Sequence, residues 1–181
     1  MLFEKKTITL KDGRSATLRS PVPEDGAALL DFLRLTAGET EFLIRYPEEC
    51  MTDVKAEEAF LSNICQSETN LMILCEIDGR LVGNCHLWYE PKKKLRHRGE
   101  LAIALTKDCW GLRLGSAMLS ELVTQAERWG LENLFLSYIE GNDRGRGLYE
   151  KLGFREVARI PESYRLKDGS LRSDIWMMKK L

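Results

Sequence analysis

The sequence lacks any long hydrophobic run. None of its apolar stretches approaches the about 20 consecutive residues that a membrane-spanning helix needs. Its first residues, MLFEKKTITLKDGR, lack the apolar centre of a secretory signal. We therefore expect neither a helical membrane protein nor a secreted one, and predict a cytoplasmic location.

A dominant charge of one sign is also missing. The chain has 27 lysines and arginines against 28 aspartates and glutamates, for a net charge of −1. Such a balance creates no overall field that attracts nucleic acid or an anionic membrane, so neither is an expected partner. The basic stretch at residues 92–98 carries no interleaved aromatic residue. It is more typical of a solvated loop than of a binding patch.

Residues that hold metals are few. The sequence has two histidines, and its five cysteines include no Cys-x-x-Cys pair: Cys50, Cys65, Cys75, Cys85 and Cys109. This pattern favours reduced thiols over disulfides or zinc, and we expect no metal site. A covalent intermediate on Cys109 is disfavoured, because no histidine lies nearby in sequence to activate the thiol.

What the chain does have is the composition of one folded domain. Its 181 residues are 44% hydrophobic and 30% charged. That length suffices for one core and is short for two ordinary domains. No repeat, linker or low-complexity segment interrupts the sequence, so residues 1–181 are expected to form a single domain.

The hydrophobic pattern predicts a mixed α/β domain. Strands are expected at 7–10, 15–19, 71–77, 81–89, 101–105, 133–140, 154–166 and 171–178. Helices are expected to open at 21–25, near Thr52 and near Leu114, and to cover 144–152. In the second helix the side chains expected to face inward are Ala56, Ala59, Phe60 and Ile64.

The central stretch, residues 100–121, joins a strand to a helix through a turn that contains Gly111 and Gly115. A helix N-terminus of this kind can hold a phosphate with its free N–H groups and its dipole. The alternative is a loop in which the glycines merely permit a turn. The Walker and dinucleotide patterns both fail, because Gly115 is followed by Ser116-Ala117 and three residues separate the two glycines.

Two motifs carry a family resemblance. Residues 110–116, WGLRLGS, resemble the acyl-CoA loop Arg/Gln-x-x-Gly-x-Gly/Ala of the GNAT superfamily of N-acetyltransferases. Residues 142–154, NDRGRGLYEKLGF, are similar to the same superfamily's Asn-x-x-Ala-x-x-Leu-Tyr-x-Lys-x-Gly-Phe. The resemblance implies an α/β (mixed α+β) fold. Its mostly antiparallel sheet would be splayed between two parallel strands, here 101–105 and 133–140, and flanked by helices.

The chain departs from these motifs at four positions. Trp110 stands where Arg or Gln is usual, Arg113 replaces the first glycine, and Gly145 and Gly147 replace alanines. If the position of Arg113 needs only a right-handed helical backbone, arginine is tolerated there and its guanidinium can reach a phosphate. If that position needs close backbone approach, the affinity for the cofactor suffers.

The resemblance implies acetyl-CoA as cosubstrate. Its pantetheine arm would insert between the two parallel strands and bind the main chain of Ile103, Ala104 and Leu105. Its pyrophosphate would lie on the backbone of residues 111–116, which are Gly111, Leu112, Arg113, Leu114, Gly115 and Ser116. Asn142 and Tyr149 would also contact the cofactor. Asn142 has the alternative role of capping the helix that follows it.

Tyr149 resembles the family's general acid, which protonates the departing thiolate, although it could also be a core aromatic. Glu100 is the candidate base, acting directly or through a water; the alternative is a salt-bridged strand residue. Ser137 offers no carboxylate where some protein-acetylating relatives carry their base.

The expected activity is transfer of an acetyl group from acetyl-CoA to a primary amine of a small molecule or peptide, by direct attack in a ternary complex. The alternatives are a non-catalytic acyl-CoA-binding module and a protein N-terminal or lysine acetyltransferase. The segment between the first two helices carries Glu39, Glu41, Glu48 and Glu49, which would favour a cationic amine unless they form only a solvated loop. The sequence leaves open whether the protein forms a homodimer.

Overall fold

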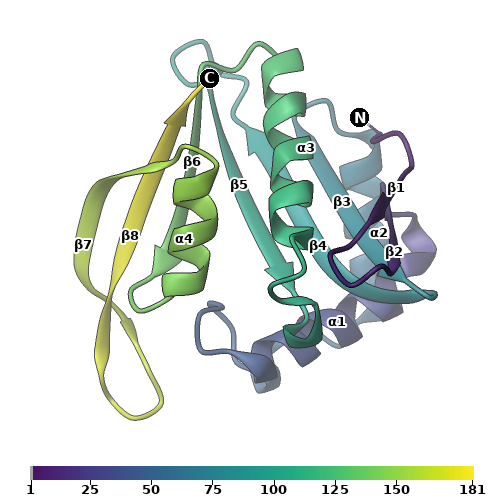
Figure 1. The fold of residues 1–181 in the computed structure, drawn as a ribbon, viewed down its shortest axis with the longest axis horizontal. Helices are drawn as coiled ribbons and strands as arrows, with labels where there is room; N and C mark the ends of the chain where they lie inside the picture. Colours follow the sequence, from purple (N-terminus) through teal and green to yellow (C-terminus); the bar gives the residue numbers. More distant parts are fainter. Residues whose placement is uncertain (1) are drawn as a thin grey trace.

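The computed structural model describes residues 2–181, which build one eight-stranded sheet (Figure 1). The strand order is β1-β2-β3-β4-β5-β6-β8-β7. The strands are β1 Lys6–Thr9, β2 Ser15–Arg19, β3 Asn70–Ile77, β4 Arg80–Tyr89, β5 Arg98–Leu105, β6 Asn133–Ile139, β7 Arg155–Arg165 and β8 Leu171–Lys180. Among these eight strands of the described residues, only β5 and β6 are paired in parallel. The predicted mixed α/β fold with a mostly antiparallel sheet is confirmed.

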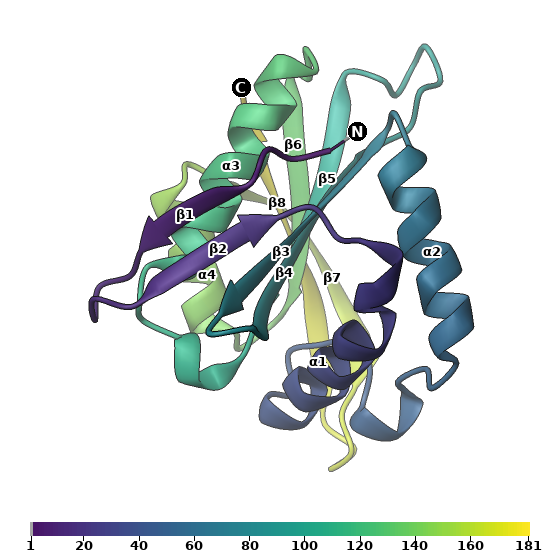
Figure 2. The same cartoon turned by 90° about the vertical axis from the view of Figure 1, so that its right-hand side faces the viewer.

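Four helices cover the sheet: α1 Gly26–Glu39, α2 Val54–Gln66, α3 Leu114–Arg128 and α4 Asp143–Lys151. The side view in Figure 2 places α1 and α2 on one face and α3 and α4 on the other. A larger core lies under α3 and α4, and a smaller one contains Leu29, Phe32, Leu61 and Ile64 of α1 and α2. Strand β3 is therefore buried on both sides, which explains its continuous apolar run.

The inward face of α2 differs from the prediction. Of the four side chains predicted to face inward, Ile64 is buried, whereas Ala56, Ala59 and Phe60 are exposed, with 41% of the Phe60 surface accessible. Glu57 and Leu61 are buried in their place. Positions 56, 60 and 64 are separated by steps of four residues, and positions 57, 61 and 64 by steps of four and three. Both sets are compatible with one face of an α-helix. Periodicity therefore allows both faces, and packing on α1 and β3 selects the second.

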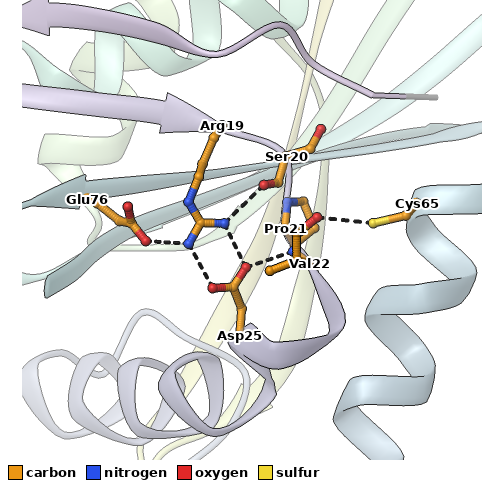
Figure 3. Close-up of polar contacts among 7 residues, drawn as sticks. All are labelled: Arg19, Ser20, Pro21, Val22, Asp25, Cys65 and Glu76. Carbon is orange, nitrogen blue, oxygen red and sulfur yellow. Dashed lines mark hydrogen bonds and ion pairs between the residues drawn. The ribbon is translucent and has the colours of Figure 1, made fainter. Parts of the chain in front are cut away.

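The start of α1 is fixed by a cluster of polar contacts (Figure 3). The two terminal nitrogens of Arg19 donate to the two carboxylate oxygens of Asp25 at 2.7 Å, and Arg19 also bonds Glu76 on β3. On the helix side, the thiol of Cys65 in α2 donates to the carbonyl of Pro21 at 3.2 Å. These contacts join β2, β3, α1 and α2 at one corner of the molecule.

Strands β5 and β6 pair over three residues only. The register is Arg98 with Asn133, Gly99 with Leu134 and Glu100 with Phe135, and no pairing continues beyond it. The predicted splaying of the two parallel strands is confirmed. Strand β5 begins at Arg98, three residues before the predicted start, so residues 101–105 all lie in the part that has separated from β6.

Three kinds of feature are absent from residues 2–181. The five cysteines are all free thiols. In the same part of the chain, no group of three or more His, Cys, Asp or Glu side chains is placed to hold a metal ion. No helix there combines the length and the hydropathy needed to cross a bilayer.

Candidate active site

A cavity of about 470 Å³ opens where β5 and β6 diverge. Residues 101–105 of β5 form one wall, and Ser137 and Tyr138 of β6 form another. The first part of α4, from Asn142 to Tyr149, and the segment at residues 40–44 complete it, together with Trp110. The main chain of both strands is thus exposed to a space of molecular size.

The loop before α3 has a backbone suited to an anion. Gly111 and Arg113 have positive φ angles, +78° and +66°, and α3 begins at Leu114. The first N–H groups of a helix have no partner within it, so residues 114–116 present donors at the positive end of the dipole. The donor set fits a phosphate group. Trp110, directly before the loop, lines the cavity, whereas residues 111–116 do not.

The backbone of Arg113 is in the left-handed region. The right-handed helical conformation that would have tolerated arginine is therefore not the one observed. A non-glycine residue there carries strain of about 1–2 kcal/mol. Glycine, the residue of the family motif, would take this conformation without that cost. The Arg113 side chain is exposed and remains available to a ligand.

Gly115 serves the packing of α3. A Cβ at this position would lie 3.0 Å from Leu148 of α4 and 3.4 Å from Leu105 of β5. The glycine therefore lets α3 approach both elements, which holds the helix N-terminus beside the cavity. A direct role in pyrophosphate binding stays a prediction.

Trp110 joins three parts of the site. Its indole N–H donates to the carbonyl of Leu105 at 3.1 Å, at the end of β5. The guanidinium of Arg144, near the start of α4, lies 5.0 Å from the centre of the Trp110 ring. The sequence marked Trp110 only as a departure from the motif, whereas the structure gives it and Arg144 a place in the cavity wall.

Tyr149 is both a core residue and a cavity residue. Its ring is buried, with the ring centres of Tyr138 and Phe154 at 6.0 and 6.4 Å. Burial, and secondarily the neighbouring Tyr138, raises the pKa of Tyr149 to about 12. The phenol therefore keeps its proton at neutral pH, as a general acid must.

Asn142 caps α4. Its Oδ1 accepts a hydrogen bond from the N–H of Gly145 at 2.9 Å. A Cβ at Gly145 would fall 2.7 Å from the Asn142 amide nitrogen, so the glycine makes room for the cap. Asn142 also lines the cavity, and its predicted contact with the cofactor stays a prediction.

Glu100 lies outside this cavity. It lines a neighbouring pocket of about 330 Å³ with Trp88, Tyr89 and Arg98, and its Oε1 is 3.6 Å from Nη2 of Arg98. Strand alternation puts its side chain on the same face as Ala102, which does line the cavity. The structure thus does not bring Glu100 together with Tyr149, and its role as base stays a prediction.

Two glutamates of the acidic segment hold the local backbone. Glu39 accepts from the N–H of Lys107 at 2.7 Å, and Glu49 accepts from the N–H of Tyr46 at 2.8 Å. The backbone N–H groups therefore fix the orientation of these two carboxylates, which leaves them less free to turn toward a ligand.

A third glutamate ties the segment to the β7–β8 hairpin. Glu48 forms an ion pair with Lys167 at 2.6 Å, and the Lys167 ammonium lies 4.3 Å from the centre of the Tyr46 ring. These contacts join the two segments on the side of the sheet opposite α4. In Figure 1 the tip of the hairpin and the segment after α1 both lie below β6.

Residues 40–44 belong to the segment between the first two helices, which the family resemblance placed beside the acceptor, but the sequence singled out only the glutamates of that segment. Phe42 packs beside Gly141, where a Cβ would lie 3.5 Å from its ring, and Ile44 is 74% exposed. The segment has no periodicity. The one available signal was three consecutive apolar residues, 42–44, in an otherwise polar stretch.

The divergent parallel strands, the open helix N-terminus and the buried tyrosine are the features expected of an acyltransferase. The chain belongs to the acetyltransferase (GNAT) family, whose model matches residues 36–154.

Solved structures support the same assignment. A GNAT-family acetyltransferase from Streptococcus pneumoniae is 26% identical, with a TM-score of 0.86 over 92% of this chain and 99% of that one. A ribosomal-protein-alanine N-acetyltransferase from Brucella melitensis is 22% identical, with a TM-score of 0.77 over 91% and 99%. A putative acetyltransferase from Salmonella typhimurium, solved with its cofactor acetyl-CoA, is 20% identical, with a TM-score of 0.78 over 92% and 94%. The last two likenesses show a shared fold. None of the curated proteins matches the sequence.

Proposed function

We propose that the protein is an N-acetyltransferase that moves an acetyl group from acetyl-CoA to a primary amine by direct attack in a ternary complex. The observation that carries this proposal is the separation of β5 and β6 after Glu100, which leaves strand main chain facing a cavity. The acetyl-CoA bound to the Salmonella typhimurium neighbour supports the choice of cosubstrate.

The site fits the separate parts of acetyl-CoA. The amide groups of a pantetheine arm need hydrogen-bond partners, and residues 101–105 offer strand edges that β6 does not use. The pyrophosphate needs donors and positive charge, which the N–H groups of residues 114–116 and the exposed Arg113 supply. A main-chain N–H of β5 can also stabilise the oxyanion that forms on the thioester carbonyl.

Tyr149 would assist departure of the thiolate. Its pKa of about 12 exceeds the value of about 8.5 expected for a thiol by about 3.5. Complete proton transfer to the sulfur would thus be unfavourable by roughly 5 kcal/mol in the free site. We infer that the phenol first donates a hydrogen bond to the sulfur as its charge develops, and that the cost of transfer falls as that charge grows.

A small amine is favoured over a long peptide as acceptor. The contacts of Lys167 with Glu48 and Tyr46 close the segment after α1 against the β7–β8 hairpin. An extended peptide would have to displace these contacts, whereas a polyamine or an amino acid would not. The remaining acidic charge favours a cationic amine. A protein N-terminal or lysine acetyltransferase and a non-catalytic acyl-CoA-binding module are the alternatives.

The test is release of free thiol from acetyl-CoA with a panel of amines at low and high salt. The panel compares polyamines, amino acids, and short peptides with basic or acidic first residues. We expect release with small cationic amines and weaker rates at high salt. Equal or faster release with peptides would indicate the peptide alternative, and binding of acetyl-CoA without release for any amine would indicate the binding module.

A further inference from the structure

A buried carboxylate lies behind the acceptor side of the cavity. Asp174 of β8 is 8% exposed, and its Oδ2 accepts from the indole N–H of Trp176 at 2.8 Å. Its second oxygen, Oδ1, has no hydrogen-bond partner among the described residues. A buried charged oxygen without a partner is costly, so its presence needs an explanation beyond stability.

The sheet register connects Asp174 to the cavity. In the β6–β8 ladder, Ser137 is opposite Trp176, and Ile139 is opposite Asp174. Directly opposed residues project on the same face, so Ser137 and Asp174 are diagonal neighbours about 7–8 Å apart. Ser137 is exposed and lines the cavity. One hydroxyl group between these two side chains would span that distance.

Tyr164 of β7 supplies such a hydroxyl. The β7–β8 register shifts between Ile160 and Tyr164, and Glu162 within this bulge has a φ of +55°. Bulges re-aim side chains beside functional sites. Burial raises the pKa of Tyr164, the neighbouring Asp174 carboxylate raises it further, and the Ser137 hydroxyl lowers it. Tyr164 is opposite Arg172, which lies two residues before Asp174 on β8, so the register puts the phenol on the same face of the sheet as Asp174.

We propose that Ser137, Tyr164 and Asp174 form a proton relay that removes the proton from the acceptor nitrogen, a role that rests on the proposed function. Attack of the neutral amine forms the C–N bond and leaves an extra proton on nitrogen. That nitrogen donates its proton to Ser137 Oγ, the Ser137 hydroxyl proton passes to Tyr164 Oη, and the Tyr164 proton passes to Asp174 Oδ1.

The relay balances as one proton transfer. The nitrogen loses one proton, both hydroxyl groups are regenerated, and the Asp174 carboxylate becomes a carboxylic acid that later returns the proton to solvent. The C–S bond breaks with its electron pair on sulfur, beside Tyr149. The unpaired Oδ1 is thereby explained, because it is the oxygen that receives the proton.

No other carboxylate of the described residues is as well placed. Glu100 lines the neighbouring pocket. Among the residues that line the cavity, Asp143 alone carries a carboxylate, and it lies exposed in the first turn of α4. That helix covers the face of the sheet opposite to Ser137. Neither Glu100 nor Asp143 therefore offers a route to the acceptor side of the cavity, whereas the relay through Ser137 does.

The experiment compares Tyr164→Phe, Asp174→Asn and the double variant, with spermidine and lysyl-alanine as acceptors. Each single change should lower kcat for thiol release about 10²-fold or more. Calorimetry should find the acetyl-CoA affinity unchanged. The double variant should be no slower than the slower single variant, because one broken link already interrupts the relay. Additive losses, or full kcat in either single variant, would overturn the proposal.

Thermal unfolding separates the relay from a structural role. Asn at position 174 still accepts from Trp176 and removes a buried unpaired charge, so Tm should stay equal or rise. A lowered Tm that accompanies the loss of kcat would overturn the proposal. Asp168→Asn is the matched control, an exposed aspartate in the turn of the same hairpin, and should keep full kcat.

The failures are distinguishable. A wild-type protein that releases no thiol with either amine removes the proposed function and the relay together. A working wild type whose three variants match it removes the relay alone.

Discussion

The two ends of the β5–β6 pair differ although the strands are the same. At the closed end, residues 98–100 pair with residues 133–135, and Gly99 has no Cβ where one would lie 2.7 Å from Leu131 and 3.2 Å from Leu134. At the open end, residues 101–105 have separated from β6 and line the cavity. The part of β5 before Leu101 therefore stabilises the sheet, and the part from Leu101 onward faces the cavity.

The two ends of β5 also differ in what packs beside them. At the closed end, leucine side chains pack against the glycine and leave room for the ladder. At the open end, α3 approaches through Gly115, and Leu148 of α4 packs against it. Substitutions at the closed end should therefore change stability, and those at the open end should change rate.

The largest expected effect lies at the open end. Tyr149→Phe removes only a hydroxyl group, so it should lower kcat by about 10²–10⁴ if Tyr149 is the acid. Steady-state thiol release measures the rate, and calorimetry with acetyl-CoA should find the affinity nearly unchanged. Wild-type turnover in this variant would remove Tyr149 from the chemistry.

An acid-dependent effect is expected in β4, where His86 is opposite Ala102 at the open end. Burial lowers the pKa of His86 from 6.5 to about 4. The unfolded chain binds the proton first, so stability contributed by the neutral ring is present above pH 6.5 and lost as pH falls toward 4. The full loss is roughly 3 kcal/mol.

Urea unfolding at several pH values, with His86→Gln as the comparison, measures this loss. The glutamine should retain a partner for Asn70, whose Oδ1 lies 3.2 Å from His86 Nε2. Parallel stability curves for the wild type and the variant between pH 6.5 and 4 would show that His86 is solvated rather than buried.

Gly99→Ala should destabilise the closed end. The new methyl group would meet Leu131 at 2.7 Å, and overpacking of this kind costs about 1–3 kcal/mol. Urea unfolding measures the change, while the folded variant should keep the wild-type affinity for acetyl-CoA. A variant that lost affinity with unchanged stability would break the distinction between the two ends.

The smallest effects are expected in α4, where two glycines differ in their surroundings. A Cβ at Gly147 meets nothing within 4 Å, whereas one at Gly145 collides with the Asn142 cap. Gly147→Ala should therefore stabilise the protein by roughly 0.5–1 kcal/mol through helix propensity. Gly145→Ala should destabilise it, and equal shifts in Tm for both would contradict the capping role of Asn142.

The sequence predicted the open end well because its signals are local. An apolar strand, a glycine-bearing turn and a helix with buried Leu114, Met118 and Leu122 follow each other directly, and the structure contains all three. The motif around Tyr149 also fixed its place on a short helix. Family membership, which the motifs indicated, is confirmed.

The rest depended on contacts between distant segments. The predicted buried face of α2 was wrong at most positions, because two sets of positions, one with Phe60 and one with Leu61, fit the same helical period. Asp174 comes close to Ser137 and Tyr164 only through the β6–β8 register and a bulge in β7. Residues 40–44 enter the cavity wall without any periodic pattern. Local spacing contains none of this information.

The central claim is that acetyl-CoA binds between the strands at the open end, and amide hydrogen exchange tests it most directly. Acetyl-CoA should slow exchange over residues 101–105 and 136–139, where the strands are not paired with each other, and leave residues 98–100 unchanged. Slowing confined to the pocket around Trp88 and Glu100, or no slowing at the open end, would contradict the account.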